Sequence, residues 1–191
     1  ANDISAVSLL KGKPHAVGPL VNAYNEGTLS YMQRNGAIRV ALPVELSLKA
    51  IAALSAAIPS GPELEVFAYG RLPLAISARC YHARAHGLSK DSCQYVCERD
   101  ADGMDVDTLD NEPFLVVNGV QTMSRTCVNL LRALPELRSA GVNRFRLSPQ
   151  SWDMVAVAQV FRDVLDGTEG IECGVEKLEC LNRDMGYSNG Y

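Results

Sequence analysis

The chain has 191 residues, of which 47% are hydrophobic and 21% are charged, and its formal net charge is −4. This composition is that of an average soluble globular domain, and it excludes collagen-like, coiled-coil and disordered classes. No apolar run reaches the roughly 18 residues that a membrane span requires, and the acidic balance disfavours binding of nucleic acid through its phosphates. Because the first residues also lack the pattern of a signal peptide, we expect a cytoplasmic protein with one domain over residues 1–191.

Short apolar runs alternate with amphipathic segments over the first 70 residues. Side chains that can cap a helix N-terminus precede three of these segments, at Asn2 or Asp3, at Asn25 and at Ser47. The pattern predicts helices at 4–10, 26–35 and 48–58 and strands at 15–17, 37–41 and 64–67.

The alternation breaks at residues 77–112, where three cysteines, two histidines and many charged residues gather. A loop of this length inside a compact domain usually has a function or binds a cofactor. After it, the pattern predicts strands at 114–117 and 144–147 and helices at 128–137 and 151–165, whereas residues 168–191 show little periodicity.

Successive strand–helix units predict an α/β fold with parallel strands and right-handed crossovers. A TIM-barrel-like (β/α) fold is favoured over a doubly wound sheet, because no Gly-x-Gly-x-x-Gly follows the first strand. Chemistry in such a barrel lies where strands end and loops begin. The polar residues expected at those ends are Asn2, Asn22, Asn25, Glu45, Tyr69, Asn118, Gln121 and Ser148.

Three cysteines with the spacing C-x12-C-x3-C are the main candidate metal ligands: Cys80, Cys93 and Cys97. Thiolates gathered in a polar loop suit zinc or an iron–sulfur cluster, and both usually take four protein ligands. The alternative is three unrelated buried thiols. A fourth ligand is expected from outside the chain or from the set His82, His86, Cys127, Cys173 and Cys180.

His82 and His86 have the i, i+4 spacing of metal ligands on a helix. Ala83 stands where the zinc proteases carry a glutamate, so we interpret both histidines as ordinary loop residues. A Gly-x-Ser-x-Gly elbow is also absent from the sequence.

Other charged residues have two interpretations each. Glu45 is either a ligand-binding carboxylate or an acid near a helix N-terminus. Arg71, Arg79 and Arg84 either hold an anionic substrate or pair with the nearby acids Glu98, Asp100 and Asp102.

Residues 68–84 (AYGRLPLAISARCYHAR) and 90–97 (KDSCQYVC) resemble the collagenase-like peptidase family U-32. Within it, the chain is most similar to the ubiquinone-biosynthesis branch, with further matching segments at 2–7, 42–47, 117–124 and 146–150. The resemblance implies a barrel-like fold, a 4Fe-4S cluster and a paralogous, UbiU-like partner subunit in a heterodimer. The implied activity is the oxygen-independent hydroxylation of the ubiquinone ring during ubiquinone biosynthesis.

Carried over by position, Cys80, Cys93 and Cys97 are three of the four cluster ligands. The fourth ligand, the N-terminal strands and the extreme C-terminus are expected to lie outside this sequence. Glu45, Asn118 and Gln121 are expected to position a substrate. Other members of the family bear the name of peptidases or hydroxylate RNA bases, and these remain the alternative functions.

Overall fold

The computed structural model describes residues 1–182 and 185–190. Contacts divide the chain into two compact units, the first made of residues 1–68 and 132–147 and the second of residues 69–131 and 148 onward. The strand β3 (Glu63–Ile76) crosses the boundary between Ala68 and Tyr69, so it contributes to both units. The single domain expected over the whole chain stays a prediction.

The first unit joins a small parallel sheet to short helices. Its other elements are α1 (Ile4–Leu9), β1 (His15–Val17), η1 (Pro19–Val21), α2 (Glu26–Arg34), β2 (Ala37–Ala41), α3 (Leu48–Ala57), α5 (Leu134–Ser139) and β7 (Val142–Leu147). β1, β2 and the first part of β3 are parallel, and β7 pairs with β3. This parallel portion confirms the α/β prediction.

Local sequence explains where the helices of this unit begin. The side chains of Asp3, Asn25 and Ser47 each accept a hydrogen bond from a backbone N–H in the first turn of α1, α2 and α3, which satisfies a donor that the helix itself leaves free. The three expected caps are therefore confirmed. Apolar side chains from these helices and strands fill the core, among them Val7, Leu29, Met32, Val40, Leu42, Ile51, Leu134 and Val142.

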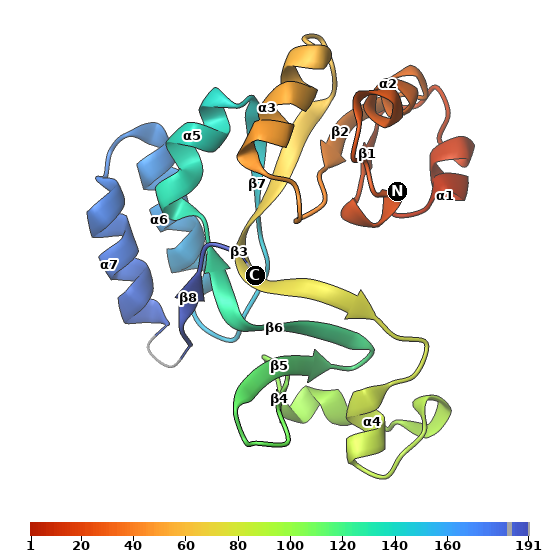
Figure 1. Ribbon diagram of the computed structural model, residues 1–191, viewed down its shortest axis with the longest axis vertical. Helices are drawn as coiled ribbons and strands as arrows, with labels where there is room; N and C mark the ends of the chain where they lie inside the picture. Colours follow the sequence, from red (N-terminus) through yellow and green to blue (C-terminus); the bar gives the residue numbers. More distant parts are fainter. Residues whose placement is uncertain (183–184, 191) are drawn as a thin grey trace. The chain divides into compact units, whose positions relative to one another are not determined.

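The second unit is built on antiparallel pairing. Its elements after β3 are α4 (Tyr81–Ala85), η2 (Lys90–Ser92), η3 (Val96–Arg99), β4 (Met104–Asp107), β5 (Pro113–Asn118), β6 (Gln121–Asn129), α6 (Met154–Asp166), α7 (Ile171–Leu181) and β8 (Tyr187–Ser188). β3 pairs with β6, β6 with β5 and β5 with β4, all antiparallel, and the short β8 is parallel to β6. Figure 1 shows β4, β5 and β6 as green neighbours and α6 and α7 as adjacent blue helices, which contact each other.

The strand order is β1-β2-β3-β6-β5-β4, with β7 beside β3 and β8 beside β6. The sheet formed by the described residues is mixed and open, so a closed TIM barrel is not confirmed. No helix among residues 1–182 and 185–190 is long and apolar enough to cross a membrane.

Two predictions from the sequence pattern were wrong. The helix expected at 128–137 begins only at Leu134, after the 3-10 turn η4 (Leu131–Ala133), because Cys127 and Val128 pair with β3. Residues 171–181 form α7, although little periodicity was evident there. Val175 and Leu178 are buried on one side of α7. On the same helix, Gly174 allows a close approach to Leu131 and Val164, since a Cβ at this position would lie 2.9 Å from Leu131 and 3.0 Å from Val164.

Candidate functional site

The cysteine segment, residues 77–103, folds into three short helices rather than an irregular loop. α4 follows the end of β3, and the chain then passes through η2 and η3 before entering β4. α4 contacts both η3 and β5. The segment therefore packs against the antiparallel sheet of the second unit, and its residues have fixed neighbours.

Cys80 forms the start of α4. Its buried Sγ accepts a hydrogen bond from the backbone N–H of Ala83 at 3.4 Å, in the position that a capping oxygen usually takes. This contact fixes the position of the Cys80 side chain at the start of α4.

Cys93 and Cys97 are half-buried and lie on either side of a sharp turn. Cys93 ends η2 and Cys97 lies in η3. Between them, Gln94 and Tyr95 have φ values of 51° and 52°, a left-handed conformation that costs a residue with a side chain roughly 1–2 kcal/mol. This turn directs η3 onto α4, so the segment that carries Cys97 contacts the helix that Cys80 caps.

All six cysteines of the chain are free thiols. Three of them on neighbouring short helices supply soft sulfur donors of the kind that hold iron–sulfur clusters or zinc. Among the described residues their sulfur atoms do not form a group within 4.8 Å of one another, so their role as ligands of one ion or cluster stays a prediction. Cys127 is buried in β6, and Cys173 and Cys180 are exposed on α7.

His82, His86 and Asp100 form a compact group that the sequence interpretation did not foresee. One potential ligand atom from each residue lies within 4.8 Å of the others. His82 is fully buried, Asp100 is half-buried and His86 is exposed. Asp100 ends η3, whereas His82 lies in α4 and His86 ends it.

The two imidazole rings of this group have defined orientations. Nδ1 of His82 lies 3.3 Å from the carbonyl oxygen of Val117, and Nδ1 of His86 lies 3.1 Å from that of His82. The rings stack with centroids 5.4 Å apart. Nε2 of His82 lies 2.9 Å from Oδ2 of Asp100, but off the direction of a hydrogen bond, so it has no hydrogen-bond partner among the described residues.

The expected substrate-positioning residues fall into both units. Asn118 and Gln121 face each other across the β5–β6 hairpin, and the Asn118 amide donates to the carbonyl oxygen of Ala101 at 3.2 Å. Glu45 is an exposed residue of the first unit, and its charge helps to raise the pKa of Tyr24, after the larger effect of burial. The structure brings Asn118 and Gln121 together, and the role of all three residues stays a prediction.

A polar cavity of about 580 Å³ lies within the second unit. Arg71, Asp102, Arg125 and Trp152 contribute to its wall. Arg71 is buried, and its Nη1 donates to the carbonyl oxygens of Ser124 (2.9 Å) and Arg125, while burial lowers its pKa. The sequence had marked Arg71 as a possible anion-binding residue, but the order of the strands was needed to locate this wall.

The family description "Peptidase family U32" matches residues 2–185 of the chain. The match includes the cysteine segment and extends through both units. No solved structure matches the chain.

Proposed function

Because the chain belongs to peptidase family U32, we propose that it is a UbiV-like iron–sulfur protein of ubiquinone biosynthesis. With a UbiU-like partner it takes part in the oxygen-independent hydroxylation of a ubiquinone-precursor ring. The observation that carries the proposal is the position of Cys80, Cys93 and Cys97 in one segment, in which α4, capped by Cys80, contacts η3, which contains Cys97. The matching sequence around these cysteines supports the ubiquinone branch.

In this proposal Cys80, Cys93 and Cys97 would be three of the ligands of a 4Fe-4S cluster, which would supply electron transfer. The backbone N–H of Ala83 fixes the Cys80 side chain, and the left-handed turn at Gln94 and Tyr95 positions the two later cysteines. In the same proposal the parallel strands β1 to β3 belong to a TIM-barrel-like fold.

Glu45, Asn118 and Gln121 are proposed to position the aromatic substrate. Asn118 is suited to this role because one of its amide hydrogens already binds Ala101, which fixes the side chain beside the cysteine segment. Its amide oxygen remains an acceptor for a ring hydroxyl.

A peptidase mechanism has less support. Cysteine peptidases need a thiolate beside a histidine that is itself oriented by a third group. In residues 1–182 and 185–190, no hydrogen bond joins a cysteine thiol to a histidine ring. The family name therefore does not carry a proteolytic function for this chain.

The test is anaerobic purification of the complete protein with its partner, followed by iron and sulfide analysis. We expect a brown protein with about four iron and four sulfide per cluster, and loss of iron on Cys93→Ser or Cys97→Ser. Cys173→Ser is the matched control, because this exposed cysteine lies on α7, outside the cysteine segment. Colourless protein with one zinc held by the same cysteines would contradict the cluster.

The reaction is tested separately by incubating the complex, in the absence of O2, with a ubiquinone-precursor ring and an oxygen-atom donor that is reduced by two electrons as it gives up its oxygen. We expect a mass increase of one oxygen atom in the ring, which is lost in Cys93→Ser and kept in Cys173→Ser. Hydrolysis of gelatin, or hydroxylation of RNA bases without ring hydroxylation, would replace the proposed function by an alternative one.

A further inference from the structure

We propose that His82, His86 and Asp100 bind a single divalent transition-metal ion such as Zn²⁺, at a site separate from the three cysteines. The inference does not depend on the proposed function. It rests on the orientation of the two imidazole rings, on the unpartnered ring nitrogen of His82 and on the arrangement of the three residues around one point.

The first argument is the protonation pattern of the rings. A carbonyl oxygen only accepts, so the contacts to Val117 and His82 carbonyls require a hydrogen on Nδ1 of both histidines. In each neutral ring, Nε2 then carries the free lone pair. Metal-binding histidines commonly show this arrangement, with the second ring nitrogen donating to a carbonyl or carboxylate that fixes the ring.

The second argument is the environment of Nε2 of His82. This atom is buried and has no hydrogen-bond partner among the described residues, a condition that is costly in a folded protein. Oδ2 of Asp100, 2.9 Å away, is a carboxylate oxygen and can only accept. A cation between these two atoms satisfies both of them.

The separation of the two atoms agrees with a shared metal ion. Nitrogen and oxygen ligands at 2.0–2.2 Å from zinc lie about 2.9–3.4 Å apart when the angle at the metal is about 90–110°. The 2.9 Å between Nε2 and Oδ2 is within this range.

The donor set predicts which ions bind. Two imidazoles and a carboxylate suit zinc and similar ions, whereas thiolates are the donors that iron–sulfur clusters need. No cysteine belongs to the group within the described residues. Because His86 is exposed, the solvent side offers a position for water or another ligand, as in zinc sites with three protein ligands.

The ion would link α4, which carries both histidines, to Asp100 at the end of η3. Cys80 caps α4 and Cys97 lies in η3, so the same link holds together the two elements that carry these cysteines. The site is therefore proposed as a structural cross-link of the cysteine segment.

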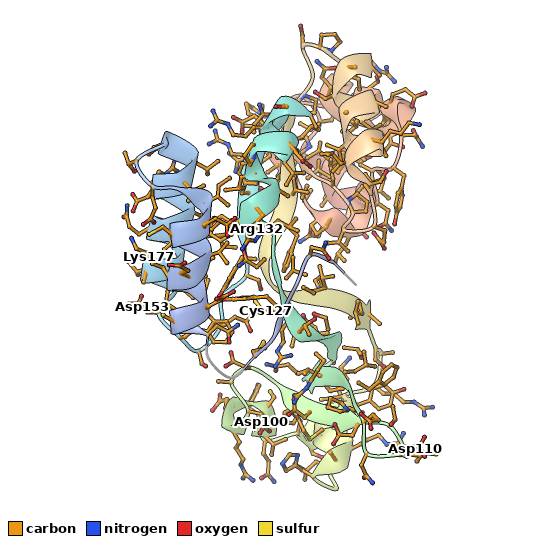
Figure 2. All side chains as sticks on the ribbon, turned by 60° about the vertical axis from the view of Figure 1, so that its left-hand side comes forward. Asp100, Asp110, Cys127, Arg132, Asp153 and Lys177 are labelled. Carbon is orange, nitrogen blue, oxygen red and sulfur yellow. The ribbon has the colours of Figure 1, made fainter. Side chains whose placement is uncertain are left out.

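The experiment is calorimetric titration of the full chain with Zn²⁺, after replacement of Cys80, Cys93 and Cys97 by serine to remove competing thiolates. We expect one ion per chain. Loss of an outer-shell partner costs metal sites about 10–100-fold in affinity, so loss of a ligand in His86→Ala or Asp100→Asn should cost about 100-fold or more. Asp110→Asn is the matched control, since Asp110 is exposed on the turn between β4 and β5 (Figure 2).

A second measurement uses the chain with all cysteines intact. Zn²⁺ should shift the Nε2 nitrogen resonances of His82 and His86, and Co²⁺ bound to these residues should show no thiolate charge-transfer band. Absence of binding, binding that His86→Ala and Asp100→Asn leave unchanged, or unshifted histidine resonances would overturn the proposal. Iron and sulfide analysis is a separate readout, so failure of this site and failure of the proposed function are distinguishable.

Discussion

Replacement of Tyr69 by phenylalanine tests the hydrogen-bond chain at the centre of the second unit. The Tyr69 side chain is 0% exposed. Its hydroxyl accepts a hydrogen bond from Nε1 of Trp152 at 3.0 Å and lies 3.0 Å from the hydroxyl of Tyr187, which donates to the carbonyl oxygen of Leu178 at 2.8 Å. Since the Tyr187 hydrogen is used on Leu178, Tyr69 is the donor to Tyr187.

The expected cost follows from what the substitution keeps and what it removes. Phenylalanine retains the edge-on ring contacts with Trp152 and Phe161, at centroid distances of 6.4 and 5.8 Å. It removes two hydrogen bonds, each worth about 0.5–1.5 kcal/mol net, which together give about 1–3 kcal/mol. This is a substantial part of the roughly 5–15 kcal/mol by which a typical protein is stable.

The assay is equilibrium unfolding in urea at neutral pH, followed by the fluorescence of Trp152, the only tryptophan in the sequence. Tyr95→Phe is the matched control because Tyr95 is 72% exposed, and such surface changes stay within about 0.5 kcal/mol. The reasoning is refuted if Tyr69→Phe also stays within about 0.5 kcal/mol of the wild type, or if the control costs as much.

Alkaline pH gives an independent arm of the same prediction. Burial is the main cause that raises the pKa of Tyr69 above its ordinary value of 10.0, and it also raises that of Tyr187. Above pH 10 the unfolded chain therefore loses tyrosine protons that the folded chain retains, so the free energy of unfolding falls as pH rises. This fall should be shallower in Tyr69→Phe, and an unchanged slope would contradict the assignment.

Three further predictions concern single side chains. Asp153→Ala should destabilise the chain by about 1 kcal/mol, because Oδ1 of Asp153 accepts hydrogen bonds from the backbone N–H groups of Val155 and Ala156 at 3.0 Å each. Asp153 is labelled in Figure 2. Asp166→Ala at the other end of α6 is the control, and equal urea unfolding midpoints of the two variants would exclude the cap. Hydrogen bonds from Arg144 and Arg39 lower the pKa of Glu63 from 4.5 to about 2. The stability that the ionised Glu63 contributes is therefore present above pH 4.5 and is lost as pH falls toward about 2. The free energy of unfolding of Glu63→Gln should differ from that of the wild type most above pH 4.5, and a difference that does not change with pH would refute this. The Cys173 thiol donates a hydrogen bond to Glu169 at 3.2 Å, which raises the pKa of the thiol. Glu169→Gln should therefore speed the alkylation of Cys173 near neutral pH, measured by peptide mass spectrometry. Burial raises the pKa of Cys127 to about 11, so Cys127 should stay unmodified in the folded chain.

The first unit could be predicted from the sequence because its signals are local. Asp3, Asn25 and Ser47 each act on backbone groups two or three residues away, and the strands 15–17 and 37–41 are short apolar runs between turn residues. Such features do not depend on distant contacts, so composition and spacing suffice to locate them.

The second unit could not be predicted in the same way, because its strands depend on pairing between distant residues. β4 lies inside the stretch expected to be a loop, and its alternating MDVD becomes a strand by pairing with β5. The two-residue connection Gly119-Val120 between β5 and β6, with Gly119 at φ 60°, is a local hairpin signal that the sequence interpretation missed. The pairing of β6 with β3 joins residues about 50 positions apart, such as Arg71 and Cys127, and has no such local signal.

The two candidate metal sites show the same contrast. The C-x12-C-x3-C spacing was visible in the sequence, and the structure places all three cysteines in one segment. Asp100 was considered only as a partner for arginines. Its position beside His82 results from the left-handed turn at Gln94 and Tyr95, and neither residue type predicts such a turn.

The length of α4 gives a physical reason for ligand sites at both of its ends. The helix has five residues, whereas an isolated helix of fewer than about 12–15 residues is marginal in water. Cys80 caps its first turn, and His86, at its C-terminal end, lies with Nδ1 3.1 Å from the carbonyl oxygen of His82. A ligand bound to either site orders α4 and so lowers the conformational entropy that binding at the other site must still remove. Binding at the cysteine site and binding at His82, His86 and Asp100 should therefore favour each other, since the first ligand bound already carries the entropy cost of ordering the shared helix.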